Sequence, residues 1–495
     1  MNVVIASSEV TPFSKTGGLA DVCGALPLAL AKRGAKPMVI TPAYRCVLRS
    51  KLSLERTDVD LNIPIGSKVV RGGILKTVLP DSDIPVYFVE QPTYFDRHEL
   101  YREAGEDYKD NCERFVFFCR AVMQTIQTLD LPVDILHCND WQTGLIPAYL
   151  RVEYERVPGF EHMVSLLTIH NLAYQGCFWH WDMLLTGLDW KYFNWRQMEF
   201  FDHLNLLKTG IVFADAVSTV SPRYAEEIQG QPLGCGLDDA LKLRRDVLYG
   251  VINGVDYGVW NPEIDPYLSA RYDVTNWIAG KAANKASLRS EMGLPASPSA
   301  PLIGLVGRLA DQKGWDLVAA IMKRWVRDTD VQWVILGTGE PVYHQLLYGL
   351  AKEHPDKVAV RLEFSDRLAN QIEAGADIFL MPSLYEPCGL NQLYSLQYGT
   401  VPLVRETGGL ADSIRDASSE NLASGIANGF SFQTYDGASL EETLRHACSV
   451  FLQQPHIWKQ LVETGMRQDL SWVQSAKQYI DIYKTTLRKR NEVPA

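Results

Sequence analysis

The chain has 495 residues, of which 46% are hydrophobic and 22% charged, and it contains 12 Trp and 22 Tyr. This length exceeds what one hydrophobic core usually serves, so we expect two or more domains. The composition excludes global disorder. The net charge of −11 argues against a nucleic-acid partner, and the short basic run at residues 488–490 is typical of a solvated helix end.

The sequence contains nine Cys without any Cys-x-x-Cys pair, and it lacks a His-Glu-x-x-His motif. We therefore expect reduced thiols, no metal and no cofactor. The first residues are typical of a strand rather than a leader, and no apolar run approaches about 20 residues. These features predict a cytoplasmic protein without a membrane span, or an organelle stroma protein whose leader has been removed.

The first half of the chain alternates short β-branched runs with longer amphipathic stretches. Strands are predicted at residues 3–7, 37–41, 86–89, 135–138, 164–169 and 216–220, and helices at residues 24–33 and 111–129. Several of the strands are apolar throughout, which is typical of parallel strands buried on both faces. This alternation predicts a doubly wound sheet.

The same alternation restarts in the second half. Strands are predicted at residues 302–306, 331–336, 358–362, 378–381 and 401–404, and helices at residues 315–326, 341–354, 368–374 and 390–397. Between the halves, Asn253-Gly254-Val255-Asp256 is a turn signal after a strand-like run at residues 247–252. We expect an α/β protein with two doubly wound, Rossmann-like domains.

Two similar glycine loops precede helical patterns. Thr16-Gly17-Gly18-Leu19-Ala20-Asp21 recurs as Thr407-Gly408-Gly409-Leu410-Ala411-Asp412. Paired glycines let the backbone approach a ligand, and the first turn of a helix offers N–H groups to an anion. Lys15, beside the first loop, has the charge to neutralise a phosphate. A tight structural turn with an exposed lysine fits the same residues.

Three further loops carry polar residues after predicted strands. Arg308 and Lys313 follow one strand, and a forked guanidinium with a compact ammonium suits a diphosphate. Glu386 lies in a turn bounded by Pro and Gly, where a carboxylate can bind sugar hydroxyls. His170 ends another strand beside Asn and Gln. Solvated loop charges, a helix-start carboxylate and a structural histidine are the alternatives.

Short acidic pairs at Asp58-x-Asp60, Asp81-x-Asp83 and Asp328-x-Asp330 match a pattern found in metal-using glycosyltransferases. They lie in polar stretches away from the glycine loops, so we interpret them as solvated.

Together the motifs resemble those of bacterial glycogen synthases and plant starch synthases, from Met1 to about Tyr483. The motifs that carry the resemblance are Lys15–Val22, Tyr108-x-Asp110-Asn111-x-x-Arg114-Phe115, His170–Gly176, Asn205–Lys208, Ser218–Ala225, Asn253–Asp256, Arg308 with Lys313, Glu386–Leu390 and Thr407–Asp412.

The resemblance implies a B-type glycosyltransferase fold, in which two Rossmann-like domains face a cleft. It places a glucan acceptor domain at residues 1–255, a nucleotide-sugar donor domain at 256–471 and a C-terminal helix at 472–495 that crosses back to the first domain. It also implies retaining, metal-independent transfer of glucose from ADP-glucose, with UDP-glucose as the alternative donor, to the non-reducing end of an α-1,4-glucan. Granule association is a further expectation.

Site roles also come from the resemblance. The catalytic residues it implies are Asp21, Asp140, His170, Arg308, Lys313 and Glu386. The donor-binding residues are Lys15, Gly17, Gly18, Asn253, Arg308, Lys313, Cys388, Gly389, Leu390, Thr407, Gly408 and Gly409. The acceptor-binding residues are Tyr94, Trp141, Asn171, Tyr174 and Gln175.

Some residues depart from the family pattern. Tyr394 stands where many related retaining transferases have a second Glu, Asn391 replaces a usual Thr, and residues 137–141 are closer to the granule-bound type. Two other functions stay open: a nucleotide-sugar epimerase on the same scaffold, and a non-catalytic granule protein that binds glucan through surface aromatics at residues 94, 95 and 101. The presence of Lys15, Arg308, Lys313 and Glu386 argues against the second.

Overall fold

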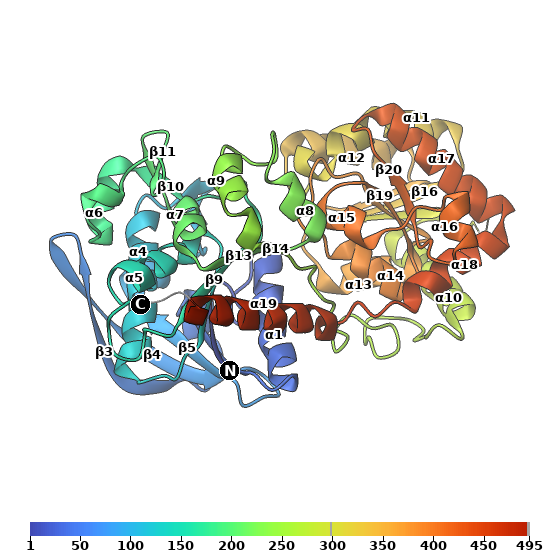
Figure 1. The fold of residues 1–495 in the computed structure, drawn as a ribbon. Helices are drawn as coiled ribbons and strands as arrows, with labels where there is room; N and C mark the ends of the chain where they lie inside the picture. The colour runs from blue at the N-terminus through green and yellow to red at the C-terminus, as the bar shows by residue number, and fades with distance from the viewer. Residues whose placement is uncertain (298, 493–495) are drawn as a thin grey trace. The chain divides into compact units, whose positions relative to one another are not determined.

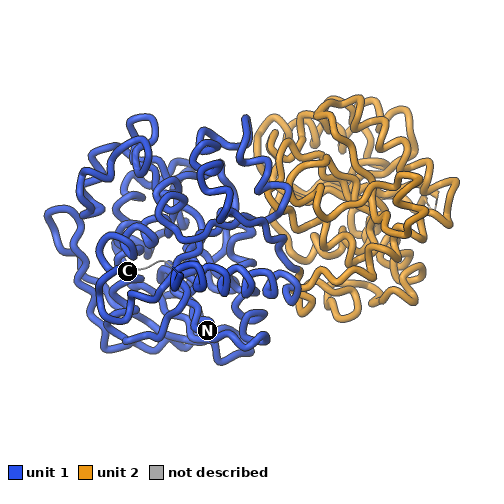
Figure 2. Tube along the Cα trace, viewed as in Figure 1, with its two compact units in different colours: residues 1–254, 472–495 blue, residues 255–471 orange. Residues whose placement is uncertain are grey.

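In the computed structural model, which describes residues 1–297 and 299–492, the chain divides into two compact units (Figure 2). Unit 1 comprises residues 1–254 and the C-terminal segment that begins at Trp472. Unit 2 comprises residues 255–471.

Among the described residues, unit 1 is built on a nine-stranded sheet with the order β14-β13-β9-β8-β1-β2-β5-β4-β3 (Figure 1). The strands from β14 to β5 pair in parallel, whereas β4 and β3 form an antiparallel edge. Their bounds are β1 Asn2–Ala6, β2 Lys36–Pro42, β3 Glu55–Ile65, β4 Lys68–Val78, β5 Pro85–Glu90, β8 Ile135–Asn139, β9 Val164–Ile169, β13 Ala216–Thr219 and β14 Leu248–Gly250.

Helices pack on the sheet of unit 1, and short strands that lie outside this sheet separate some of the helices along the chain. The helices are α1 Gly18–Lys32, α2 Arg45–Leu48, α3 Pro92–Phe95, α4 Asn111–Thr128, α5 Leu145–Val152, α6 Met183–Thr186, α7 Leu206–Phe213, α8 Pro222–Glu227, α9 Asp238–Leu243 and α19 Trp472–Glu492. The small strands are β6 Arg102–Glu103, β7 Glu106–Asp107, β10 Cys177–Trp179, β11 Glu199–Phe200 and β12 His203–Asn205.

The central strands of unit 1 are buried on both faces. In β1, Val4 belongs to one hydrophobic cluster, while Val3 and Ile5 belong to another. The C-terminal helix α19 joins that second cluster through Trp472 and Tyr483, and α19 packs against α1. The final helix of the sequence is therefore part of unit 1.

Among the described residues, unit 2 is built on a six-stranded parallel sheet with the order β17-β16-β15-β18-β19-β20. The strands are β15 Leu302–Val306, β16 Gln332–Leu336, β17 Val358–Arg361, β18 Ile378–Met381, β19 Val401–Arg405 and β20 Phe430–Phe432. The helices are α10 Trp277–Met292, α11 Trp315–Asp328, α12 Pro341–Glu353, α13 Asp366–Gly375, α14 Asn391–Tyr398, α15 Gly408–Ser413, α16 Ser419–Ala423, α17 Gly437–Gln453 and α18 Pro455–Met466.

In both sheets the strand order reverses at a switch point, where ligands bind in doubly wound folds. In unit 2 the chain winds outward from β15 to β17 and then returns to place β18 on the other side of β15. In unit 1 the corresponding neighbours are β1 and β8. The loops that follow these strands therefore lie at the edge of each sheet where a site is expected.

The predicted pair of doubly wound sheets is confirmed, and the two antiparallel strands at the edge of unit 1 were not predicted. Residues 59, 61, 63 and 65 of β3 are buried in alternation, a pattern of period two that the sequence carries. Helix α1 begins at Gly18, six residues earlier than the helix predicted from residue 24.

Candidate active site

The switch point of unit 2 is made of two loops that pack tightly on each other. The Leu384 N–H donates to the Gln312 carbonyl over 3.0 Å. Gly314 has a φ of +77°, and a Cβ at this position would lie 2.1 Å from the Pro382 carbonyl oxygen. Glycine is therefore required where the loop after β15 crosses the loop after β18.

Lys313 and Glu386 come together at this crossing. The Lys313 ammonium lies 2.6 Å from a Glu386 carboxylate oxygen, and the Ser383 hydroxyl donates to the same oxygen over 3.1 Å. The Glu386 side chain is 8% exposed and that of Lys313 is 28% exposed. The sequence predicted separate roles for these two residues, whereas the structure makes them one ion pair with the lysine on the solvent side.

Arg308 lies on the same loop as Lys313. Its side chain is exposed, and one guanidinium nitrogen donates to Gln312 over 2.7 Å. Arg308 and Lys313 therefore lie on one loop, and the buried Glu386 carboxylate lies on the loop that packs against it, an arrangement that suits a ligand with more than one negative charge.

The second glycine loop packs directly against the backbone that carries Glu386. A Cβ on Gly408 would lie 2.0 Å from the Glu386 carbonyl oxygen, and one on Gly409 would lie 2.0 Å from the Cys388 carbonyl oxygen. The Gly409 N–H donates to the Glu386 and Pro387 carbonyls over 3.1 Å. These glycines bring two loops together, and their binding to a donor phosphate stays a prediction.

The other predicted donor residues of unit 2 lie around the start of α14. Cys388 and Thr407 are buried, Gly389 has a φ of +71°, and Leu390 directly precedes the helix. The Asn391 amide donates to the Val306 carbonyl over 2.9 Å, so the residue that replaces a usual Thr links α14 to the end of β15.

Tyr394 is the residue that the sequence analysis singled out in place of the second Glu of other retaining transferases. Its ring stacks on Trp260 with ring centroids 3.9 Å apart and planes 5° apart. Tyr394 is 8% exposed and belongs to a small hydrophobic cluster. Packing therefore takes the place of a carboxylate here.

The switch point of unit 1 carries the first glycine loop. The Lys15 ammonium lies 2.7 Å from Asp21, and Thr11 also donates to that carboxylate over 3.3 Å. Gly17 precedes α1 and Gly18 begins it. Lys15 and Asp21, for which the sequence predicted separate roles, are thus brought together by one turn of chain.

Glu9, a residue that the sequence analysis missed, forms hydrogen bonds to this loop. Its carboxylate accepts hydrogen bonds from the Thr16 N–H over 2.5 Å, the Thr16 hydroxyl over 2.7 Å and the Gly17 N–H over 3.3 Å. Glu9 is 3% exposed. The signal in the sequence was the polar run Ser7-Ser8-Glu9 directly after a buried strand.

Asp140 follows β8 at the same edge. Its φ is +55°, in the left-handed region, and its carboxylate accepts the His170 N–H over 2.7 Å. Burial raises the pKa of the Asp140 carboxyl from 3.8 to about 7, the His170 hydrogen bond opposes this, and the charge of Glu9 raises the pKa further. A carboxyl with this pKa exchanges its proton near neutral pH.

His170 is neutral and has a defined tautomer. Its Nε2 lies 2.9 Å from Asn139 Oδ1, and the Asn139 amide nitrogen donates to the Ala6 carbonyl over 3.1 Å. Because the Ala6 carbonyl fixes the orientation of the Asn139 side-chain amide, His170 Nε2 carries the proton and donates it to Asn139 Oδ1. Nδ1 is therefore free of a proton and can accept a hydrogen bond. Burial lowers the pKa of His170 to about 3.

His137 lies on β8, before Asp140 in the chain. Its ring nitrogens lie 2.7 Å from the Tyr483 hydroxyl and 2.6 Å from the Thr168 hydroxyl. Burial lowers the pKa of His137 to about 3, with the neighbouring His170 adding to the shift. His137 therefore links α19 to the sheet as a neutral group.

The predicted acceptor residues around His170 differ in exposure. Tyr174 is 48% exposed, and the Gln175 amide donates to the Cys235 carbonyl over 3.0 Å. The Asn171 side chain accepts the Ala173 N–H over 3.1 Å. The Trp141 ring packs edge-on against the Phe115 ring, with ring centroids 4.9 Å apart.

Asn253, predicted to bind the donor, lies at the end of unit 1 and is 5% exposed. Its Oδ1 is buried without a hydrogen-bond partner among the described residues. The binding of the donor by Asn253 stays a prediction.

The expectation that Tyr94 and Phe95 are surface aromatics is wrong. They are 5% and 0% exposed, and the Tyr94 hydroxyl donates to Glu113. Both rings pack in the core because α3 lies against α4, so neither can stack on a glucan. Exposed aromatics of unit 1 lie elsewhere, among them Tyr174, Trp179, Trp181, Trp190, Trp195 and Phe201.

Among residues 1–297 and 299–492, no group of three or more His, Cys, Asp or Glu side chains could hold a metal ion. No helix in that part of the chain is both long enough and apolar enough to span a membrane.

Comparison with known proteins gives a consistent result over nearly the whole chain. Residues 2–243 match the starch synthase catalytic domain family, and residues 293–450 match glycosyl transferases group 1. The chain is 46% identical to a glycogen synthase of Rhodopirellula baltica, covering 98% of each chain. It is 47% identical to a glycogen synthase of Anaeromyxobacter dehalogenans, covering 98% of this chain and 99% of the other.

Among solved structures, the catalytic domain of starch synthase IV from Arabidopsis thaliana bound to ADP and acarbose is similar, with a TM-score of 0.89 and 32% identity over 98% of this chain and 99% of that one. Two doubly wound units, together with these family matches, place the chain among glycosyltransferases of the B type. Within that class, the chain belongs to the family of glycogen and starch synthases. The predicted resemblance is confirmed.

Proposed function

We propose that this glucosyltransferase moves glucose from ADP-glucose to the non-reducing end of an α-1,4-glucan with retention of the anomeric configuration. The observation that carries the proposal is the pairing of Lys313 with Glu386 beside Arg308 at the switch point of unit 2. The ADP bound to the starch synthase IV structure supports the choice of nucleotide.

In this proposal, unit 2 binds the donor. Arg308 and Lys313 neutralise the diphosphate, whose negative charge grows as the bond to the anomeric carbon breaks. Fixed cations stabilise that charge where it develops. Glu386 binds glucose hydroxyls and at the same time orients Lys313.

Unit 1 is proposed to bind the acceptor glucan. Tyr174 and Gln175 contact the glucan, while Asp140 and His170 flank the reacting sugar. Burial lowers the pKa of His170 to about 3, so its ring is neutral near pH 7 and its proposed role is that of a hydrogen-bonding group. Lys15 supplies a further cation for the donor phosphate. We propose that the acceptor hydroxyl attacks from the face that the phosphate leaves, and that a phosphate oxygen takes its proton.

Association with glucan granules is a finer part of the proposal. The ring centroids of Trp181 and Trp190 lie 5.5 Å apart, and the Trp190 ring stacks on the Phe193 ring with centroids 5.1 Å apart. Trp179 and Trp181 are 62% and 49% exposed. A cluster of exposed aromatic rings without a hydrophobic cover is typical of a binding surface, and flat rings suit the apolar faces of sugars.

The test is transfer of radiolabelled glucose to glycogen, with ADP-glucose and UDP-glucose compared side by side. We expect the higher kcat/KM with ADP-glucose. Equal or higher kcat/KM with UDP-glucose refutes the donor assignment. Absence of glucan elongation, with sugar epimers formed instead, favours the epimerase alternative.

A further inference from the structure

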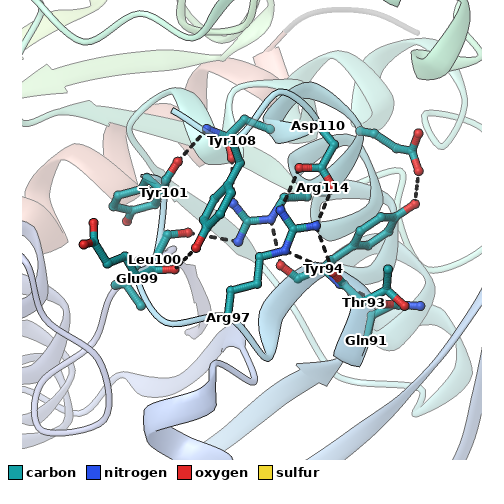
Figure 3. A network of polar contacts seen from close by, with 12 residues as sticks. Gln91, Thr93, Tyr94, Arg97, Glu99, Leu100, Tyr101, Tyr108, Asp110 and Arg114 are labelled. Carbon is teal, nitrogen blue, oxygen red and sulfur yellow. Dashed lines mark hydrogen bonds and ion pairs between the residues drawn. The ribbon is translucent and has the colours of Figure 1, made fainter. Parts of the chain in front are cut away.

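One family motif, Tyr108-x-Asp110-Asn111-x-x-Arg114-Phe115, has no role in the proposed reaction. Its central residue is Arg114 on α4, which is 0% exposed. The guanidinium donates to the Tyr94 carbonyl over 2.7 Å, to the Leu100 carbonyl over 2.9 Å and to the Asn111 side chain over 2.6 Å (Figure 3). Arg114 therefore fixes the backbone at both ends of the segment from residue 94 to residue 100.

The next residue of that segment, Tyr101, is held by the same motif. Its carbonyl accepts the Tyr108 N–H over 3.0 Å and the Asn111 side-chain amide over 2.9 Å (Figure 3). Its ring lies 6.0 Å from that of Phe115. Four residues of the motif thus set the position of one tyrosine.

The Tyr101 hydroxyl reaches the first glycine loop through Glu9. It lies 2.7 Å from Glu9 Oε1, to which it donates, and 2.7 Å from the Ser8 hydroxyl. Burial and the charge of Glu9 raise the pKa of Tyr101 well above its usual value, so the hydroxyl keeps its proton as a donor. Glu9 in turn accepts the two backbone N–H groups of Thr16 and Gly17.

We propose that Tyr101 and Glu9 are positioning residues for the loop that carries Lys15, with the Arg114 network as their anchor. A hydrogen bond from a buried hydroxyl fixes which carboxylate oxygen of Glu9 faces the loop, and the loop amides follow that oxygen. The inference rests on the proposed function, because it assumes that Lys15 acts on the donor phosphate.

A purely structural role predicts something different. A lost buried hydrogen bond would then lower thermal stability and leave the kcat of the folded enzyme unchanged. A positioning role instead lowers kcat, because a catalytic group misplaced by about 1 Å can cost about a hundredfold in rate. The two roles are therefore separated by kcat measured on folded enzyme.

The experiment uses Tyr101→Phe, which removes the hydroxyl and keeps the ring. Tyr149→Phe is the matched control, because Tyr149 is also buried in unit 1 and its hydroxyl donates to the Thr186 carbonyl over 2.9 Å. With ADP-glucose and glycogen, we expect Tyr101→Phe to lower kcat by about tenfold to about a hundredfold and to leave the KM for glycogen within about twofold. Tyr149→Phe should change neither.

A double variant tests the route through the loop. In a Lys15→Ala background, Tyr101→Phe should have little further effect on kcat, because both changes act on one group. Glu9→Gln, which preserves side-chain volume, serves as the second variant should Tyr101→Phe fail to fold, with the same loss of kcat expected. A folded Tyr101→Phe or Glu9→Gln enzyme with wild-type kcat overturns the inference. The proposed function fails separately, if the wild-type enzyme elongates no glucan from ADP-glucose.

Discussion

The ion pair between Lys313 and Glu386 makes Lys313→Ala the most informative single change. The substitution removes the cation that lies 2.6 Å from Glu386. It leaves a carboxylate that is 8% exposed and whose oxygen still accepts a hydrogen bond from Ser383. Two effects follow from this geometry. The enzyme loses a fixed charge at the sheet edge, and Glu386 loses the group that orients it.

The two effects differ in size and in the property that reports them. Loss of one fixed donor to a developing negative charge costs about 3 kcal/mol of transition-state stabilisation, which corresponds to more than about a hundredfold in kcat. The stability of the fold should fall by about 1 to 3 kcal/mol, because one partner of a buried hydrogen-bonded carboxylate is removed. Donor KM should change less than kcat, because the charge on the diphosphate peaks only in the transition state.

Lys285→Met is the matched control. Lys285 pairs with Asp377 at 2.5 Å in the same unit, but Asp377 precedes β18 and lies at the opposite edge of the sheet. This variant should lose stability and keep its kcat. Arg308→Ala should lower kcat like Lys313→Ala, and the two changes together should be non-additive because both act on one leaving group. Wild-type kcat in Lys313→Ala that is folded by circular dichroism refutes the placement of the diphosphate.

Three further predictions concern pH, metal and polymer binding. Burial raises the pKa of Asp140 from 3.8 to about 7, so the contribution of this group to folding stability is greatest in acid and is lost as pH rises through about 7. The free energy of unfolding in urea, measured at about pH 5 and at about pH 8, should therefore differ less in Asp140→Asn than in wild type. Activity should survive EDTA because Arg308 and Lys313 supply the charge that a metal would bring, and loss of activity restored by Mg²⁺ or Mn²⁺ contradicts this. Trp181→Ala should weaken co-sedimentation with starch granules by about threefold to about tenfold, whereas Tyr348→Ala, an exposed aromatic of unit 2, should not.

The sequence predicted several central parallel strands well because such strands give a local signal. The strands at residues 164–169, 302–306 and 378–381 were predicted with their observed bounds, since each is a short, largely apolar run. Residues that directly follow such strands share one edge of the sheet. Arg308 and Glu386 could therefore be placed near a ligand from sequence alone.

Contacts set by the order of strands could not be predicted in the same way. Lys313 and Glu386 are 73 residues apart, and they meet only because β18 returns to pair beside β15. Burial was equally hidden at Tyr94, because its neighbours Thr93 and Gln91 are polar and only the packing of α3 on α4 encloses the ring. Glu9 escaped notice since a lone acidic residue is ordinarily solvated.

The electrostatics of the two switch points differ in the way that the proposed division of roles requires. In unit 2, Arg308 and Lys313 lie on one loop, and the Lys313 ammonium pairs with Glu386, so cations lie where a diphosphate would need them. In unit 1, Lys15 is paired with Asp21, and burial keeps His137 and His170 neutral. A glucan carries no charge and is recognised by hydrogen bonds and by apolar contact with its rings. Neutral hydrogen-bonding groups such as His170 can contact such a polymer without the cost of desolvating an unpaired ion.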